Sequence, residues 1–265
     1  MEHRLSPYAE RQAPRYTSYP SAPHFTPEID AAAYRAWLAA LDPSASVSLY
    51  VHVPYCSRIC WYCGCNTNAA HPGDTADFVD LLLHEIDLVA GAVGARRVAE
   101  LHWGGGTPNI LNPEEFVRIF RHLGFWFDLA QPLMHSIEID PRCLREEQVR
   151  VYADLGVNRA SIGVQTLAPP EQTEQDLLET IATALTLEPD RIALFGYAHV
   201  PWFKRRQRVI NAEDLPGPAA RFDQADAARK ALRAAGYAAI GLDHFARPDD
   251  PLALAARAGR LHRNF

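Results

Sequence analysis

Short segments with alternating apolar and polar residues are separated along this chain by longer segments with helical spacing. In segment 48–53, the apolar residues Leu49, Val51 and Val53 alternate with Tyr50 and His52, a period of two that is typical of a strand. Further strands are predicted at 98–103, 136–139, 159–164, 192–197 and 237–242. Helices are predicted at 31–41, 75–91, 113–123, 144–155, 173–185 and 219–235, with Asn112 as the N-cap of the third.

The order of these elements predicts the fold class. Strands that alternate with helices indicate an α/β protein with a parallel sheet, and we expect a partial (β/α) barrel. Residues 1–45 carry six prolines and are predicted to form an extended N-terminal arm that ends in the first short helix. Residues 46–265 would form the core, and ligands of such sheets gather at the carboxyl ends of the strands.

Composition narrows the function classes. The chain has 265 residues, of which 48% are hydrophobic and 22% are charged, as in an ordinary globular protein. Its net charge of −6 argues against a general nucleic-acid binder. No apolar run reaches the roughly 18 residues that a membrane span needs, and the first residues lack the apolar core of a secretory signal. We therefore expect a cytoplasmic protein with no membrane span.

Four of the five cysteines lie in one short segment, YCSRICWYCGC at 55–65. A reducing compartment and such short gaps disfavour disulfides, and structural zinc usually needs two ligand pairs that are well separated along the chain. We therefore predict an iron–sulfur cluster held by Cys56, Cys60 and Cys63, since this spacing lets one loop ligate three irons. The fourth iron would stay open, which indicates chemistry rather than structure.

The remaining two cysteines leave alternatives open. Cys65 is either a fourth ligand or a neighbour of the cluster, and we favour the neighbour because it would have to fold back sharply across Gly64. Cys143 stands apart from the others and is predicted to be a small buried hydrophobic residue.

Three further motifs lie at predicted strand ends. Gly104, Gly105 and Gly106, followed by Thr107, would let the backbone approach a ligand closely, although an isolated run of this kind is often only a turn. Glu138 needs a partner for its charge, either a cofactor or a salt bridge to Arg142 or Arg159. The Gln165 amide, at the end of the fourth strand, is suited to a sugar or carboxylate contact.

These motifs together resemble the radical S-adenosylmethionine superfamily, and more narrowly the oxygen-independent coproporphyrinogen III oxidases. The resemblance extends over nearly the whole chain. It rests on PRYTSYPSAPHF (14–25), LYVHVPYC (49–56), CGCN (63–66), LHWGGGTPNIL (101–111), IEIDPR (137–142), NRASIGVQ (158–165), YAHVP (197–201), LPGP (215–218) and GLDHFARPDDPLALAARAGRLHRNF (241–265).

The resemblance implies a set of cofactors and a reaction. A [4Fe–4S] cluster would bind S-adenosylmethionine at its open iron and reduce it to a 5′-deoxyadenosyl radical. The implied reaction is oxidative decarboxylation of coproporphyrinogen III to protoporphyrinogen IX in haem biosynthesis, with an unidentified electron donor and acceptor. The residues expected to contact S-adenosylmethionine are Tyr50, Tyr62, Gly105, Gly106, Thr107, Glu138, Gln165 and Ala198. Tyr50 and His52 are the residues expected nearest to the reaction, with core packing as the alternative.

The sequence also departs from this family. Between Gln165 and Arg191 there is room for one helix and no strand, so one helix–strand unit of the family is missing, with an arginine and an aspartate that the family uses for S-adenosylmethionine. The family also continues beyond residue 265 into a helical domain. Two other functions therefore stay open: a haem-binding trafficking relative, and a chain that binds a cluster without catalysis. The basic run 204–208 is interpreted as a solvated face, or as a site for substrate carboxylates or an acidic electron donor.

Overall fold

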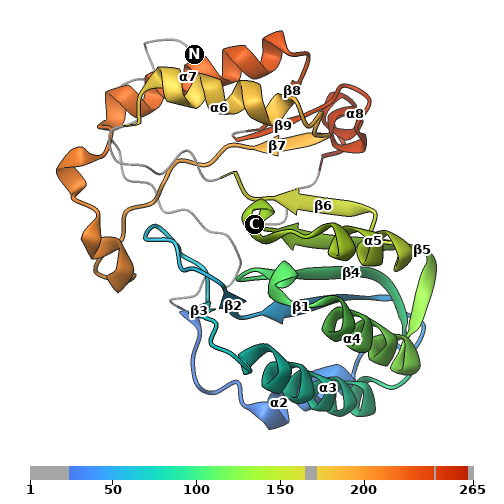
Figure 1. Cartoon of the computed structure of the whole chain (residues 1–265). Coiled ribbons are helices and arrows are strands. Elements are labelled where there is room, and N and C mark those ends of the chain that lie inside the picture. The colour runs from blue at the N-terminus through green and yellow to red at the C-terminus, as the bar shows by residue number, and fades with distance from the viewer. Residues whose placement is uncertain (1–23, 165–171, 242, 262–265) are drawn as a thin grey trace. The chain divides into compact units, whose positions relative to one another are not determined.

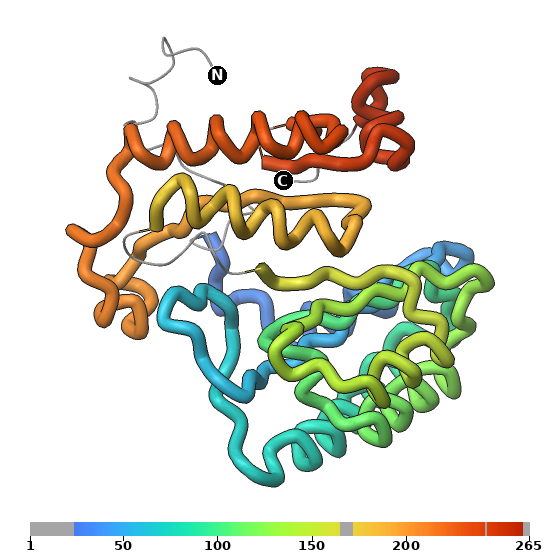
Figure 2. Tube along the Cα trace, turned by 45° about the horizontal axis from the view of Figure 1, so that its top comes forward, coloured from blue at the N-terminus to red at the C-terminus, as the bar shows by residue number. Residues whose placement is uncertain are grey.

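The computed structural model describes residues 24–164, 172–241 and 243–261, which form two compact units. One unit is Thr26–Gly163, and the other is built mainly from the chain that begins at Val164 (Figure 1 and Figure 2). Gln165 and residues 14–23 of the expected arm lie outside the described residues.

The first unit is an α/β layer structure. Its helices are α2 (Ala31–Ala39), α3 (Asp74–Val93), α4 (Pro113–Trp126) and α5 (Glu146–Asp154), with the short turns η3 (Pro108–Ile110) and η4 (Pro141–Cys143). Its strands are β1 (Val47–Val53), β2 (Tyr55–Cys56), β3 (Asn68–Ala69), β4 (Arg97–Gly105), β5 (Asp128–Ile139) and β6 (Arg159–Ile162). The order β1-β4-β5-β6, parallel throughout, confirms the predicted parallel sheet (Figure 1).

The two faces of this sheet differ in polarity. Val51, Trp103 and Ile137 lie in one cross-strand row and are buried against α3, α4 and α5, which supply Val79, Ile119 and Tyr152 among others to the same core. The rows on the opposite face are polar. They consist of Tyr50, His102 and Ser136, and of His52 and Glu138 on either side of Gly104. The alternation seen in segment 48–53 therefore separates a helix-covered core from a polar face on which a ligand can lie.

Helix starts follow the predicted capping chemistry. The Asn112 side chain accepts from the Glu115 amide at 2.9 Å while the Glu115 carboxylate accepts from the Asn112 amide at 2.8 Å, a capping box that begins α4. This confirms Asn112 as the N-cap. Thr173 caps α6 (Glu174–Leu185) in the second unit in the same way.

The second unit packs helices against a small antiparallel sheet. Besides α6, it contains η5 (Arg205–Val209), η6 (Ala212–Asp214), α7 (Pro218–Ala234) and α8 (Pro251–Arg257). The strands β7 (Arg191–Ala193), β8 (Ala238–Ile240) and β9 (His244–Ala246) are ordered β7-β9-β8. Leu177 and Ile181 of α6 pack with Leu232 of α7 in the core of this unit.

Two predicted strands therefore differ from expectation. Segments 192–197 and 237–242 were expected to continue the parallel sheet, but β7 and β8 are shorter and each pairs antiparallel with β9. The sequence analysis missed β9 because its three residues directly follow another short strand and a turn at Gly241. Three residues carry too little alternation to indicate a strand.

Candidate functional site

The cysteine segment is a loop whose two ends are held together. The loop begins at β2 and ends at β3. These two-residue strands form a small sheet of their own, in which Tyr55 pairs with Asn68 and Cys56 pairs with Ala69. The Asn68 amide donates to the Pro54 carbonyl at 2.8 Å, and the Ala70 amide donates to the Cys56 carbonyl at 2.9 Å. The loop that contains Cys60 and Cys63 therefore begins and ends at one fixed point beside the end of β1.

Two side chains anchor the returning end of this loop. The buried Thr67 hydroxyl donates to the Pro54 carbonyl at 3.2 Å and also lies 3.3 Å from Cys56 Sγ. His52 Nε2 lies 3.0 Å from the Asn66 carbonyl, which can only accept, so Nε2 carries the proton. In the neutral ring Nδ1 is then the acceptor, and the Tyr50 hydroxyl donates to it at 3.1 Å. Both ring nitrogens of His52 are thus used to position the loop.

The thiols of the loop have separate neighbours. Cys56 Sγ accepts from the Thr107 hydroxyl at 3.2 Å, and Cys60 Sγ lies 3.7 Å from Nη2 of Arg142. A hydrogen bond with Cys63, and then burial, raise the pKa of the Cys65 thiol far above its usual range. Cys65 is thus placed beside Cys63, as expected of a neighbour of the cluster, although whether it is a ligand stays a prediction.

The donor set fits a cluster better than a single metal ion. In the described part of the chain, no three His, Cys, Asp or Glu side chains are grouped closely enough to hold one ion. Cys56, Cys60 and Cys63 form no disulfide in the described residues, are only partly buried and lie on one closed loop. Three cysteine side chains on one loop are the kind of donor set that holds an iron–sulfur cluster.

The packing of the protein itself requires glycine at positions 104, 105 and 106. A Cβ on Gly104 would lie 2.9 Å from the Tyr50 ring and 3.1 Å from the Glu138 carboxyl carbon. A Cβ on Gly106 would lie 2.4 Å from Thr67 Oγ1 and 2.6 Å from the Tyr55 carbonyl oxygen. Gly105 has φ +114°, which favours glycine, and β4 continues through it instead of stopping at Gly104. The glycines thus let the cysteine loop and Glu138 come close to β4.

Glu138 has partners that the sequence analysis did not identify. Its carboxylate accepts from the Gly105 amide at 3.3 Å and lies 3.4 Å from His102 Nε2. The alternative salt bridges are not formed in the described residues, because Arg142 pairs with Asp140 and Arg159 contacts Met134. His102 also stacks on Tyr50, with ring centroids 5.5 Å apart. Burial, followed by the charge of Glu138, raises the pKa of Tyr50, so Tyr50 stays a neutral hydrogen-bond donor.

A second group links the glycine motif to the cysteine loop. Asn109, in η3 and only 2% exposed, accepts from the Asp140 amide at 2.9 Å and donates to the Asp140 carbonyl at 3.0 Å. The Asp140 carboxylate accepts from Nε and Nη2 of Arg142 at 2.9 and 2.6 Å. Cys143 is partly buried in η4, and its Sγ lies 3.5 Å from Nδ2 of the Asn109 side chain. The sequence analysis gave none of Asn109, Asp140 and Arg142 a role in the site.

Not every predicted site residue belongs to this group. Tyr62 is partly buried in the loop, where burial and a hydrogen bond with Cys60 raise its pKa. Ala198 is exposed and belongs to the second unit, so its contact with a cofactor stays a prediction. The same holds for Gln165, which lies outside the described residues.

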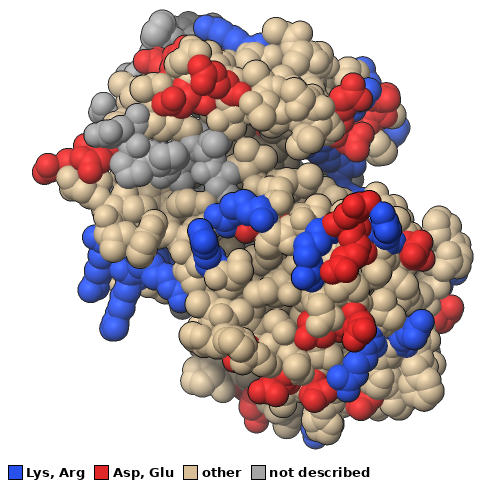
Figure 3. Space-filling view, viewed as in Figure 1, with Lys and Arg blue, Asp and Glu red and all other residues tan. Residues whose placement is uncertain are grey.

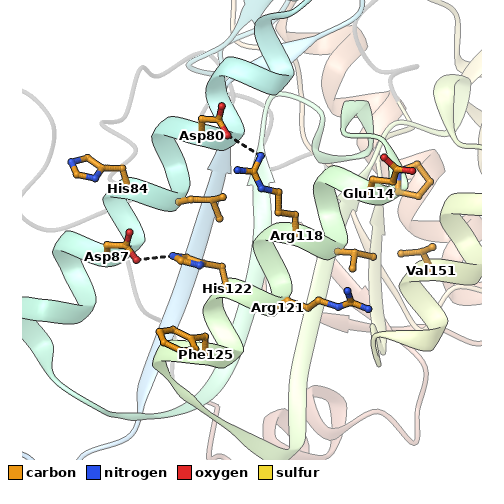
Figure 4. A pocket seen from close by; sticks show the side chains of 12 residues that line it. Asp80, His84, Asp87, Glu114, Arg118, Arg121, His122, Phe125 and Val151 are labelled. Atoms are coloured by element: carbon orange, nitrogen blue, oxygen red, sulfur yellow. Dashed lines mark hydrogen bonds and ion pairs between the residues drawn. The ribbon is translucent and has the colours of Figure 1, made fainter.

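Two other surface features contain none of the predicted site residues. A pocket between α3 and α4 is lined by Asp87, His122 and Phe125 among others, on the helix side of the sheet, as Figure 4 shows. The basic run 204–208 surrounds Gln207, which is 2% exposed, and exposes Arg205, Arg206 and Arg208. Figure 3 shows basic side chains gathered on the segment that Figure 1 colours orange. This pattern agrees with a solvated face.

A match to a known family model shows which superfamily the chain belongs to. The model of the Radical SAM superfamily matches residues 50–189, more than half of the chain, and this range contains the cysteine loop, the glycine motif and Glu138. This chain belongs to the radical SAM superfamily. A radical SAM protein is expected to combine an iron–sulfur cluster with S-adenosylmethionine, and the arrangement of Cys56, Thr107 and Glu138 is consistent with that chemistry.

Two relatives of this chain are longer than it. An oxygen-independent coproporphyrinogen III oxidase of Bradyrhizobium diazoefficiens is 43% identical over 298 residues, which take in 97% of this chain and 66% of the relative. The enzyme of the same name from Escherichia coli strain K12 is 35% identical, over 95% of this chain and 64% of the relative. The chain therefore spans about two thirds of the length of these relatives.

A solved structure has the same fold. The coproporphyrinogen III oxidase (HemN) of Escherichia coli, described as a radical SAM enzyme, matches with a TM-score of 0.87 and 34% identity, over 94% of this chain and 66% of that one. This match confirms the predicted α/β fold of radical SAM type. Among the helices that the structure describes, none is long and apolar enough to cross a membrane.

Proposed function

We propose that this chain is a radical SAM oxidoreductase that decarboxylates coproporphyrinogen III oxidatively to protoporphyrinogen IX. The observation that carries the proposal is the meeting of three motifs at one edge of the sheet. Thr107 of the glycine motif donates to Cys56 at 3.2 Å, and Gly105 of the same motif donates to Glu138 at 3.3 Å. Cysteine loop, glycines and carboxylate thus form one site at the carboxyl ends of β1, β4 and β5.

In this proposal Cys56, Cys60 and Cys63 hold a [4Fe–4S] cluster. When bound, the cluster supplies the electron that cleaves S-adenosylmethionine into methionine and a 5′-deoxyadenosyl radical. The protein fixes the geometry, because His52 and Thr67 hold the loop closed. A cluster held by cysteine thiolates suits a reducing compartment, so we propose a location in the cytoplasm.

The polar face of the sheet would hold S-adenosylmethionine. Tyr50 and His102 present stacked rings there, and Tyr50 is 57% exposed. The Glu138 carboxylate is partly exposed and suits a cationic amino group or a ribose hydroxyl. Gly106 and Thr107 would bring backbone groups to the same ligand. The buried opposite face, which contains Trp103, would exclude water from beneath the site.

The substrate is proposed from the relatives, whose names state the reaction.

An alternative function, cluster binding without decarboxylation, is supported by the length of the alignment. The match to the Bradyrhizobium enzyme extends over 298 positions, more than the 265 residues of this chain, so segments of that enzyme have no counterpart here. The helix–strand unit that we expect to be missing after Gln165 would account for such a segment. If that unit is needed for turnover, the chain binds the cluster and S-adenosylmethionine without decarboxylation.

Anaerobic reconstitution tests the proposal. Iron and sulfide are expected at about four each per chain in the wild-type protein, and much less after alanine replacement of Cys56, Cys60 and Cys63. Addition of dithionite and S-adenosylmethionine should then give 5′-deoxyadenosine, and coproporphyrinogen III should give the vinyl product. A cluster that cleaves S-adenosylmethionine but yields no vinyl product would refute the proposed substrate. Haem binding without cleavage would favour a trafficking protein.

A further inference from the structure

Arg142 is a cationic side chain that reaches the cysteine loop from another part of the sequence. Its Nη2 lies 3.7 Å from Cys60 Sγ, a distance at which an N–H group donates to sulfur. Arg142 is far from Cys60 in the sequence, on η4 after β5, and its side chain is 60% exposed. A surface arginine of this kind usually contributes little, so its role depends on how firmly it is held.

The guanidinium of Arg142 is fixed by a bidentate contact. Its Nε and Nη2 donate to the two oxygens of the Asp140 carboxylate at 2.9 and 2.6 Å, a fork that sets both the plane and the direction of the group. The hydrogen bond from Arg142 also holds the pKa of the Asp140 carboxyl below its usual range. Asp140 therefore stays charged at neutral pH and keeps Arg142 directed at the loop.

Asp140 is in turn fixed by a buried residue. Asn109 forms two hydrogen bonds with the backbone of Asp140, and Asn109 itself follows the GGGT motif in η3. The connection from Asn109 through Asp140 and Arg142 to Cys60 thus joins the glycine motif to the cysteine loop. A simple surface ion pair would not need this support from the core.

We propose that Arg142 is a positioning residue that donates a charge-assisted hydrogen bond to the Cys60 thiolate and makes the cluster easier to reduce. Reduction adds one negative charge to the cluster, and a fixed cation beside a ligand sulfur stabilises the reduced state more than the oxidised one. The inference rests on the proposed cluster but not on coproporphyrinogen as the substrate.

The test is a redox titration of the reconstituted protein, followed by the electron paramagnetic resonance signal of the reduced cluster. Arg142→Gln removes the charge and the fork, and it should lower the equilibrium constant for one-electron reduction about tenfold, which is a midpoint about 59 mV more negative. Arg142→Lys keeps a charge but loses the fork, and its midpoint should fall between those of the wild type and Arg142→Gln. The signal itself should change shape in both variants, because the hydrogen bond to one ligand sulfur is altered.

The matched control is Arg150→Gln on α5, since Arg150 also pairs with a carboxylate, Glu146, and is 73% exposed. It should leave the midpoint unchanged. A midpoint of Arg142→Gln equal to that of the wild type, with full iron and sulfide, would overturn the inference. If Arg142→Gln retains no cluster, the decision passes to Arg142→Lys, and a wild-type midpoint there overturns it equally. Absence of iron and sulfide in the wild type refutes the proposed function instead.

Discussion

The hydroxyl of Thr107 donates a hydrogen bond to Cys56 Sγ at 3.2 Å. This contact joins the turn that follows β4 to the first cysteine of the loop that follows β1. Thr107 is buried, so its hydroxyl has no water to replace Cys56 as a partner. Thr67 approaches the same sulfur from the returning end of the loop at 3.3 Å. Because the Thr67 proton is donated to the Pro54 carbonyl, Thr107 is the hydroxyl group that donates to Cys56 when it is a thiolate.

Replacing Thr107 by valine should weaken the retention of the cluster. Valine keeps the shape of threonine but removes the donor, and a hydrogen bond to a charged group contributes about 1.5–3 kcal/mol. The expected result is a cluster that loses iron and sulfide roughly tenfold or more faster in the presence of a chelator, measured by the decay of its visible absorbance. Thr107→Ser is the matched control and should behave as the wild type, since it restores the hydroxyl. Equal decay rates for valine and serine would contradict this role.

Replacing Gly106 by alanine should destabilise the first unit even without a cofactor. The new Cβ would lie 2.4 Å from Thr67 Oγ1 and 2.6 Å from the Tyr55 carbonyl oxygen. The Tyr55 carbonyl cannot move without disrupting the paired ends of the cysteine loop. Overpacking of this kind costs about 1–3 kcal/mol, measured here by urea unfolding.

Gly91→Ala makes the same chemical change, but it is expected to raise the stability of the protein. Gly91 is exposed in α3 and a Cβ there would meet nothing within 4 Å. Alanine favours a helix over glycine by about 1 kcal/mol, so this variant should unfold at higher urea concentration than the wild type. If Gly106→Ala unfolds at the same urea concentration as the wild type or at a higher one, the close approach at Gly106 does not limit stability.

The sequence predicted the parallel sheet because strands such as 48–53 and 98–103 bury one row of apolar residues and leave the other row polar. It predicted only the last four of the twelve residues of β5, which begins at Asp128, because Pro132 argues against a strand in that segment. The register between strands then decides which polar groups meet. Glu138 and His102 are 36 residues apart, and nothing local to either residue indicates the other.

The site was predicted in the same uneven way. The spacing of Cys56, Cys60 and Cys63 is local and could be recognised directly. The role of His52 as an anchor could not, because it depends on where the loop returns at Asn66. One general signal was available for Asn109 and Asp140, since polar residues directly after strands of a parallel sheet gather at one edge.

Replacing Asp87 by asparagine should lower thermal stability, in a manner that depends on pH. The Asp87 carboxylate on α3 accepts from Trp126 Nε1 and His122 Nε2 on α4, each at 2.7 Å. Figure 4 shows the contact with His122. The hydrogen bond from Trp126, followed by that from His122, lowers the pKa of Asp87 in the folded protein. A lowered folded pKa means that this stabilisation is present above the unfolded value near 3.9 and is lost as the pH falls through the folded value.

The difference in melting temperature between wild type and Asp87→Asn should therefore be constant near neutral pH and shrink below about pH 4. Asp80→Asn is the control on the same helix. Asp80 pairs with Arg118 at 2.8 Å, but both side chains are mostly exposed, and such pairs contribute little. A melting temperature of Asp87→Asn that equals that of Asp80→Asn at neutral pH would show that the contact between α3 and α4 does not depend on this carboxylate.

Replacing His52 by leucine should open the cysteine loop while leaving the sheet folded. Leucine removes the donor to the Asn66 carbonyl and the acceptor for the Tyr50 hydroxyl, and two hydrogen bonds of about 0.5–1.5 kcal/mol each correspond to a roughly tenfold increase in the open state. Alkylation of the apo protein by a thiol reagent, followed by mass spectrometry for Cys56, Cys60 and Cys63, measures this opening without any cofactor. His84→Leu on the helix side of the sheet, in the pocket of Figure 4, is the control and should leave the three rates unchanged. If His52→Leu alkylates at the wild-type rate, His52 does not hold the loop, and its predicted place in the catalytic reaction becomes the better explanation for its position beside Tyr50.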